Sequence, residues 1–173
     1  MNLKKTIFFL FILCSLKLNA QKKCEYNIDY NKIVENKSLD YLINKINSNV
    51  FIATNNVSTI PSYIKEQLNC LTNDFSIANP KQKFQSSCIA QESLPKRKLI
   101  FLAKSNNLLV MTYVLGGFTN TVHVLLIEYN ENKIVELWTG FGSNKLASTK
   151  DIIKFLNMNK NKKNFLNSKK VYF

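Results

Sequence analysis

Residues 98–139 read KLIFLAKSNNLLVMTYVLGGFTNTVHVLLIEYNENKIVELWT, and this stretch decides the fold of the chain. Four apolar runs, rich in β-branched and aromatic residues, alternate here with short polar or glycine breaks. They predict strands over residues 98–104, 108–115, 121–129 and 133–139. Because the breaks are short, successive strands must turn back on one another, which predicts an antiparallel meander.

The first of these strands is apolar on both of its faces. Leu99, Phe101 and Ala103 point to one side of an extended chain, and Ile100 and Leu102 point to the other. A strand of this kind belongs in a sheet that has no solvent-facing side. We therefore expect a sheet that is covered on both faces or curved around an interior.

Helices are predicted before and after the strand region in the sequence. Apolar residues recur at helical spacing over 39–48, 60–71 and 149–158. Ser38 offers an N-cap for the first helix, and Pro61 suits the first turn of the second. The chain is therefore expected to have an α+β fold, with N-terminal helices packed on a curved antiparallel β-meander of about four strands and a C-terminal helix.

The N-terminus has the layout of a secretory signal peptide. Lys4 and Lys5 precede an unbroken apolar run over 7–13, and Ala20 is a small residue before a cleavage site. The run is shorter than the roughly 20 apolar residues that a membrane-spanning helix needs, and no later run approaches that length. Residues 1–20 therefore predict export, to a periplasm or to the extracellular space, of a soluble chain.

The exported part is expected to form one domain. Residues 21–37 are polar and rich in Tyr and Asn, and we expect an irregular lead-in. Residues 38–158 carry the apolar patterns and are expected to be a single α+β domain. Residues 159–173 are expected to form a basic C-terminal tail.

The chain is strongly basic, with 24 Lys and Arg against 11 Asp and Glu and a formal net charge of +13. Arg97 is the single arginine among them. Bidentate contacts to phosphate and guanine favour arginine, so specific nucleic-acid recognition is not expected. A weak contact with an envelope polyanion remains possible through charge. The alternative is a solvated tail. The lysines expected to make that contact are Lys154, Lys160, Lys162, Lys163, Lys169 and Lys170.

Three cysteines remain after removal of the signal peptide: Cys24, Cys70 and Cys88. Export permits a disulfide. We expect it to join Cys70 to Cys88, because the loop between them is of moderate length, which leaves Cys24 as a spare thiol. Cys24 bridging either of the other two is the alternative, which three cysteines alone leave open. A metal site is not expected, because the chain has a single histidine and no Cys-x-x-Cys pair.

Residues 127–138, IEYNENKIVELW, resemble the last hairpin of SnoaL-like proteins in the NTF2-like superfamily, in which a Lys-Ile-Val-Glu-x-Trp strand follows a short turn. The compatible region covers residues 99–138. The sequence departs from that pattern at Asn132, where glycine is usual, and at Leu137, where histidine is common. The resemblance implies a cone-shaped α+β fold with a pocket inside it. It implies no reaction, because the superfamily includes both enzymes and non-enzymes.

His123 is the one residue that suggests proton transfer near neutral pH, as a base in a pocket. The alternative for His123 is packing or hydrogen bonding at a sheet face, and for the strand aromatics it is the core. The alternative for Glu128, on the last hairpin, is exposure to solvent. The candidate pocket residues are Tyr113, His123, Glu128, Tyr129 and Trp138.

The sequence contains no phosphate-binding glycine loop, nucleophile elbow or zinc-protease motif, so it names no reaction and no cofactor is expected. The favoured hypothesis is a non-catalytic exported binding or accessory module. One alternative is a small-molecule pocket protein or enzyme of NTF2-like type. The other is an envelope-polyanion binder.

Overall fold

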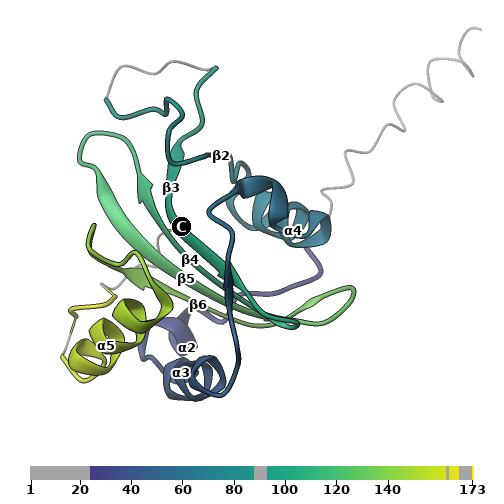
Figure 1. Cartoon of the computed structure of the whole chain (residues 1–173), viewed down its shortest axis with the longest axis vertical. Helices are drawn as coiled ribbons and strands as arrows, with labels where there is room; N and C mark the ends of the chain where they lie inside the picture. The colour runs from purple at the N-terminus through teal and green to yellow at the C-terminus, as the bar shows by residue number, and fades with distance from the viewer. Residues whose placement is uncertain (1–23, 88–92, 163, 168–172) are drawn as a thin grey trace, which may run out of the picture.

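The computed structural model describes residues 24–87, 93–162, 164–167 and 173. It shows the expected α+β fold, with helices in the N-terminal region, an antiparallel sheet and a C-terminal helix (Figure 1). The elements, in chain order, are α2 (Tyr30–Val34), α3 (Leu39–Asn47), β1 (Ile52–Ala53), the 3-10 helix η1 (Val57–Thr59), α4 (Ser62–Thr72), β2 (Ile77–Ala78), β3 (Arg97–Lys104), β4 (Leu108–Leu115), β5 (Thr121–Tyr129), β6 (Ile134–Phe141) and α5 (Thr149–Asn159).

The four long strands form the predicted meander, in which β3, β4, β5 and β6 pair with their neighbours in antiparallel order. Two short strands extend the sheet on the outer edge of β3. β1 pairs antiparallel with one end, where Ile52 lies opposite Lys104, and β2 pairs parallel with the other end, where Ile77 lies opposite Arg97. The outer edge of β3 is therefore paired at both ends, by two different segments of chain.

The helices form where their apolar stripes meet the sheet. In α3, Leu39, Leu42, Ile43 and Ile46 recur at helical spacing, and all four side chains are buried. Helix α5 begins at an N-cap, Ser148, whose side chain accepts a hydrogen bond from the Asp151 amide. These two helices contact each other beneath the sheet.

The helices cover both faces of the sheet, as the apolar pattern of β3 predicts. We call the side that carries Tyr113 and His123 the α4 face, since Phe75, which follows α4, packs its ring edge-on against Tyr113 at a centroid distance of 5.8 Å. The opposite side, the α3–α5 face, carries Thr112 and Trp138. In Figure 1, α4 lies on one side of the sheet, and α2, α3 and α5 lie on the other.

The two terminal regions are more ordered than the sequence suggested. The lead-in contains α2, whose Ile33 side chain is buried. The tail packs back on the sheet, because Leu166 is buried and its main-chain oxygen accepts a hydrogen bond from the Phe141 amide at 2.7 Å. A five-residue helix is too short to leave a periodic signal, and the contacts of the tail join residues that are far apart in the sequence.

The disulfide joins Cys24 to Cys70, with Cα atoms 5.7 Å apart, so the expected pairing of Cys70 with Cys88 is wrong. The reason lies in the path of the lead-in, which runs beside α4. The Tyr26 amide donates a hydrogen bond to the Gln67 side chain on that helix. Cys88 lies outside the described residues.

The expected signal peptide, residues 1–20, also lies outside the described residues. Among the residues that are described, no helix combines the length and the apolar character needed to cross a membrane.

Candidate functional site

His123 and Tyr113 lie directly opposite each other on β5 and β4, and their rings are stacked. The ring centroids are 5.5 Å apart and the planes are inclined by 17°. Phe141, on β6, lies on the other side of the imidazole at a centroid distance of 5.4 Å. Both His123 and Tyr113 are buried, and burial raises the pKa of Tyr113 to about 12. The two residues therefore belong to an aromatic cluster in the core.

Burial also sets the protonation state of His123. It lowers the pKa of the imidazole to about 4, with the positive charge of Arg97 as the second cause. The ring is therefore neutral at pH 7. Its Nε2 atom shares a hydrogen bond of 2.8 Å with the Thr121 hydroxyl, while its Nδ1 atom has no hydrogen-bond partner among the described residues.

Arg97 was not singled out as a site residue, yet it is the buried cation of this cluster. Its guanidinium donates hydrogen bonds to the main-chain oxygens of Asp74 and Phe173, at 2.8 and 3.0 Å, and lies over the Phe75 ring. It thus ties two distant segments, residues 74–75 and Phe173, to the start of β3. Its occurrence as the one arginine among many lysines was the signal in the sequence that could have found it.

Trp138 lies on the α3–α5 face, apart from His123. Its side chain is fully buried, and its Nε1 atom donates a hydrogen bond to the Asn36 side chain at 3.1 Å. Asn36 in turn donates to the main-chain oxygen of Lys160 at 3.2 Å. Trp138 is therefore part of the contact between the lead-in, β6 and the C-terminal segment.

Glu128 is also on the α3–α5 face, directly opposite Glu136 in the pairing of β5 and β6. It accepts hydrogen bonds from the Tyr41 hydroxyl at 2.8 Å and from the Lys45 ammonium at 2.6 Å. Glu136 forms an ion pair with Lys32. Each carboxylate is thus neutralised by a lysine from a different helix, which holds α2 and α3 against the sheet.

A pocket of about 300 Å³ opens at this carboxylate pair. It contains no unpaired cation, since Lys32 is bonded to Glu136 and Lys37 to Glu35. Its lining residues are Lys32, Lys37, Ser38, Tyr41, Glu128, Val135 and Glu136.

Tyr129 lines a second and larger pocket, of about 560 Å³, which we call the edge pocket. It lies where β1 meets the turn between β3 and β4. Ile52 is paired with Lys104, so their side chains project from the same side of the sheet. The lining residues are Asn49, Val50, Ile52, Lys104, Ser105, Asn106 and Tyr129.

Several contacts hold Tyr129 in the wall of the edge pocket. Its hydroxyl donates a hydrogen bond to the Ser105 main-chain oxygen at 3.1 Å, and burial raises its pKa. Tyr63 of α4 packs edge-on against the Tyr129 ring and donates a hydrogen bond to the Asn130 main-chain oxygen at 2.6 Å. The side of the pocket formed by Tyr129 is therefore held in place without a ligand.

The rest of the edge-pocket lining combines exposed apolar side chains with a positive charge. Val50 and Ile52 are 88% and 69% exposed, although both are large and aliphatic. Lys104 supplies the cation, and its ammonium has one long contact of 3.4 Å to the Thr59 main-chain oxygen. None of the seven lining residues carries a carboxylate. The Ser105 hydroxyl is buried and has no hydrogen-bond partner among the described residues.

The structure therefore separates the five residues that the sequence singled out. Tyr113 and His123 are together in the core, and Tyr129 shares their face but lies six positions along β5, about 20 Å from His123. Glu128 and Trp138 lie on the opposite face. His123 lines neither of the two pockets described above.

The lysines expected to bind a polyanion are partly engaged within the protein. Lys160 forms an ion pair with Asp40, and Lys162 donates a hydrogen bond to the Asn159 side chain and lies over the Phe165 ring. Lys154 is exposed on α5. Three others lie outside the described residues: Lys163, Lys169 and Lys170. No cluster of potential metal ligands occurs in the described part of the chain.

No family model, curated protein or solved structure matches this chain. The function must therefore be argued from the geometry of its own residues.

Proposed function

We propose that the chain is an exported, non-catalytic binding module that takes a small amphipathic anion in the edge pocket. Export rests on the signal-peptide pattern of residues 1–20. One observation carries the choice of ligand: Lys104 lies in a pocket without carboxylates, beside two aliphatic side chains that are left in water.

The apolar part of the ligand would cover Val50 and Ile52. Exposing a large aliphatic side chain forgoes about 1.5–3 kcal/mol of burial free energy. Val50 lies two positions before Ile52, just outside β1, and both side chains line the edge pocket, so together they form an apolar part of its wall. An alkyl chain or a ring that lies along this wall would remove both from water together.

The charged part of the ligand would contact Lys104. A lysine at the wall of a pocket with no acid neighbour attracts an anion more strongly than one paired with a carboxylate. The side-chain amide of Asn106, an exposed residue that also lines the pocket, offers a second donor. A carboxylate, sulfonate or phosphate matches this pair of donors.

The size of the pocket and its residue types favour binding over catalysis. A volume of about 560 Å³ lies within the range of roughly 300–1,000 Å³ that is usual for small-molecule sites. The seven lining residues include no His, Cys, Asp or Glu, which are the side chains that most often transfer protons or attack substrates.

Two fluorescent probes test the proposal. 8-Anilinonaphthalene-1-sulfonate is an amphipathic anion, and N-phenyl-1-naphthylamine is its uncharged counterpart. We expect both to bind, and we expect Lys104→Gln to weaken the sulfonate roughly tenfold while leaving the amine unchanged, the loss of about one charged contact. Val50→Ser combined with Ile52→Ser should weaken both probes.

Matched controls lie on exposed residues outside the pocket. Lys133→Gln removes a lysine from the turn between β5 and β6, and Val135→Ser removes an exposed aliphatic side chain from β6. Neither should change the binding of either probe. If the Lys104 and Lys133 variants behave alike, the sulfonate is bound by general surface charge and the edge pocket is not its site.

A further inference from the structure

The end of the molecule that carries the turn between β4 and β5 combines an exposed aromatic residue with several lysines. Phe118, in this turn, is 95% exposed, more than any other large apolar side chain among the described residues. We define the hairpin-end surface as Phe118 together with five residues from the chain between β2 and β3 and from the start of β3, at the same end of the molecule: Lys81, Lys83, Phe84, Lys96 and Lys98.

Main-chain contacts bring these residues together. The Gly116 amide donates a hydrogen bond to the Lys96 main-chain oxygen, and the Gln85 amide donates one to Pro95, both at 2.9 Å. A Cβ atom at Gly116 would collide with the Gln85 main-chain oxygen, so only glycine allows this approach. In Figure 1 the chain between β2 and β3 and the turn between β4 and β5 lie at the same end of the molecule.

The hairpin-end surface is positive in its described part. Lys98 lies over the Phe84 ring, with 4.6 Å from its ammonium to the ring centroid. Lys96 forms an ion pair of 3.2 Å with Asp74. Lys81 and Lys83 are exposed, and neither they nor Lys98 form an ion pair with a described carboxylate.

We propose that the hairpin-end surface docks on an anionic lipid membrane, with Phe118 inserted at the interface and the lysines against the headgroups. Charge complementarity selects an anionic partner, since each lysine near such a surface strengthens binding about fivefold. The exposed phenylalanine selects a lipid among anionic partners. A soluble polyanion offers charge but no apolar interior, whereas a membrane receives both a ring and the lysines around it.

The docked orientation leaves the edge pocket free. The edge pocket lies at the turn between β3 and β4, and the hairpin-end surface lies at the turn between β4 and β5. These two turns are at opposite ends of β4, whose eight residues span about 25 Å. The membrane contact therefore rests on observations separate from those behind the proposed ligand site.

Vesicle flotation tests the docking with the full exported chain. We expect it to float with vesicles of phosphatidylglycerol and phosphatidylcholine, to remain free with phosphatidylcholine alone, and to be released by salt. Phe118→Ser should lower the partition coefficient roughly tenfold, from the lost burial of one aromatic side chain. Lys81→Gln combined with Lys83→Gln should lower it about thirtyfold.

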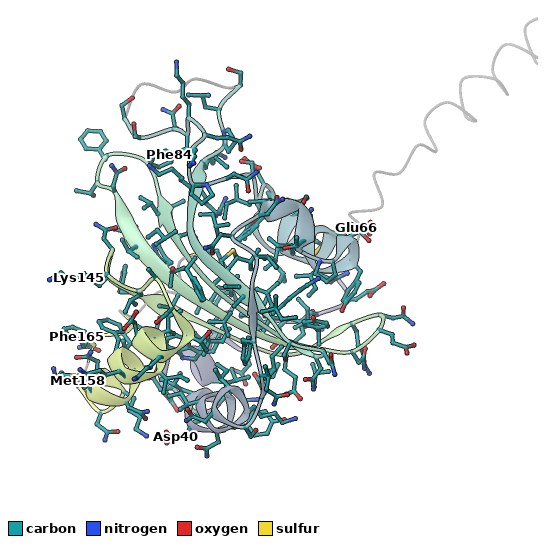
Figure 2. All side chains as sticks on the ribbon, in the orientation of Figure 1. Asp40, Glu66, Phe84, Lys145, Met158 and Phe165 are labelled. Carbon is teal, nitrogen blue, oxygen red and sulfur yellow. A yellow bond between two sulfur atoms is a disulfide. The ribbon has the colours of Figure 1, made fainter. Side chains whose placement is uncertain are left out.

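The other end of the molecule supplies matched controls. Phe165→Ser removes an exposed aromatic side chain, and Lys150→Gln combined with Lys154→Gln removes two exposed lysines from α5. In Figure 2 Phe165 lies far from Phe84. These variants should bind vesicles like the parent chain. If they lose binding as much as the hairpin-end variants do, the proposal is overturned.

A direct reading of insertion comes from Phe118→Trp with vesicles of brominated phosphatidylglycerol. We expect bromine to quench the new indole, while buried Trp138 keeps its emission. Binding without quenching, together with unchanged partition for Phe118→Ser, would show attraction by charge alone. That outcome would overturn the proposal. Heparin, a soluble polyanion without an apolar interior, is the control: it should bind equally well to the parent chain and to Phe118→Ser.

Discussion

The imidazole of His123 lies nearly parallel to the ring of Tyr113, with 5.5 Å between the ring centroids, in a part of the core that also holds the Arg97 guanidinium. Adding a proton to His123 would place a second positive charge there. The sheet is therefore built around a neutral histidine, and its stability must depend on pH.

The pKa of His123 is lowered to about 4 in the folded state by burial and by Arg97, against 6.5 in an unfolded chain. Below pH 6.5 the unfolded state takes up the proton and the folded state does not, so stability falls as the pH is lowered from 6.5 to about 4 and then stays level with respect to this group. The gap corresponds to about 3 kcal/mol. Urea unfolding of the parent chain and of His123→Gln should show this extra loss in the parent alone.

A proton NMR titration measures the same property directly. The resonances of the one imidazole should shift with a midpoint near pH 4, where folding is retained. A midpoint near 6.5 in the folded protein would show that the ring is solvated and that the aromatic cluster is open. It would also return His123 to the candidates for a pocket base.

The Cys24–Cys70 disulfide should contribute about 4 kcal/mol of stability, because it closes a loop of 46 residues in the unfolded chain. We expect Cys24→Ser combined with Cys70→Ser to lower the free energy of unfolding by about this amount. Cys88→Ser is the matched control and should leave it unchanged. Peptide mapping without reductant should recover Cys24 linked to Cys70, and a link to Cys88 would contradict the structure.

Asn36 joins three parts of the chain and adopts a left-handed backbone conformation, with φ of 55°. Its side chain accepts from Trp138 and donates to Lys160. Asn36→Ala should therefore cost about 2–4 kcal/mol, from one unsatisfied indole donor and from backbone strain. Asn36→Gly removes the same hydrogen bonds, but glycine adopts the left-handed backbone conformation without strain. In thermal unfolding, the stability of the Gly variant should therefore lie between those of the Ala variant and the parent. Equal stability of the Ala variant and the parent would rule out this role.

Export gives a prediction that mass spectrometry can check. If the signal peptide is removed after Ala20, the protein recovered outside the cytoplasm begins at Gln21. The intact mass should also be two hydrogens below that of the reduced chain, because of the disulfide. A mass beginning at Met1 would contradict processing at this position.

Long elements with a repeating pattern were predictable from the sequence. The expected strands 108–115 and 121–129 coincide with β4 and β5, and the expected helix 149–158 differs from α5 by one residue. Each of these segments buries a continuous apolar stripe, and a stripe of that length is visible in the sequence itself. Apolar residues on both faces of β3, also a local pattern, predicted that the sheet would be covered on both sides.

Contacts between distant segments were not predictable in the same way. The pairing of Cys24 with Cys70 depends on the path of the lead-in along α4, which no local pattern encodes. The separation of Trp138 from His123 depends on which face each occupies, and a two-residue periodicity cannot say which helix covers a face. The edge pocket depends on the pairing of Ile52 with Lys104, residues 52 positions apart.

The contacts of Asn36 with Trp138 and of Lys32 with Glu136 join residues more than 100 positions apart. A chain that crosses a membrane N-terminus first presents α2 long before β6 emerges, so α2 has no surface to pack on during most of the crossing. The meander itself, made of neighbours in sequence, can pair as each strand arrives. If the chain is exported as we propose, this order of emergence makes the lead-in a late-folding segment, because its packing must wait for β6.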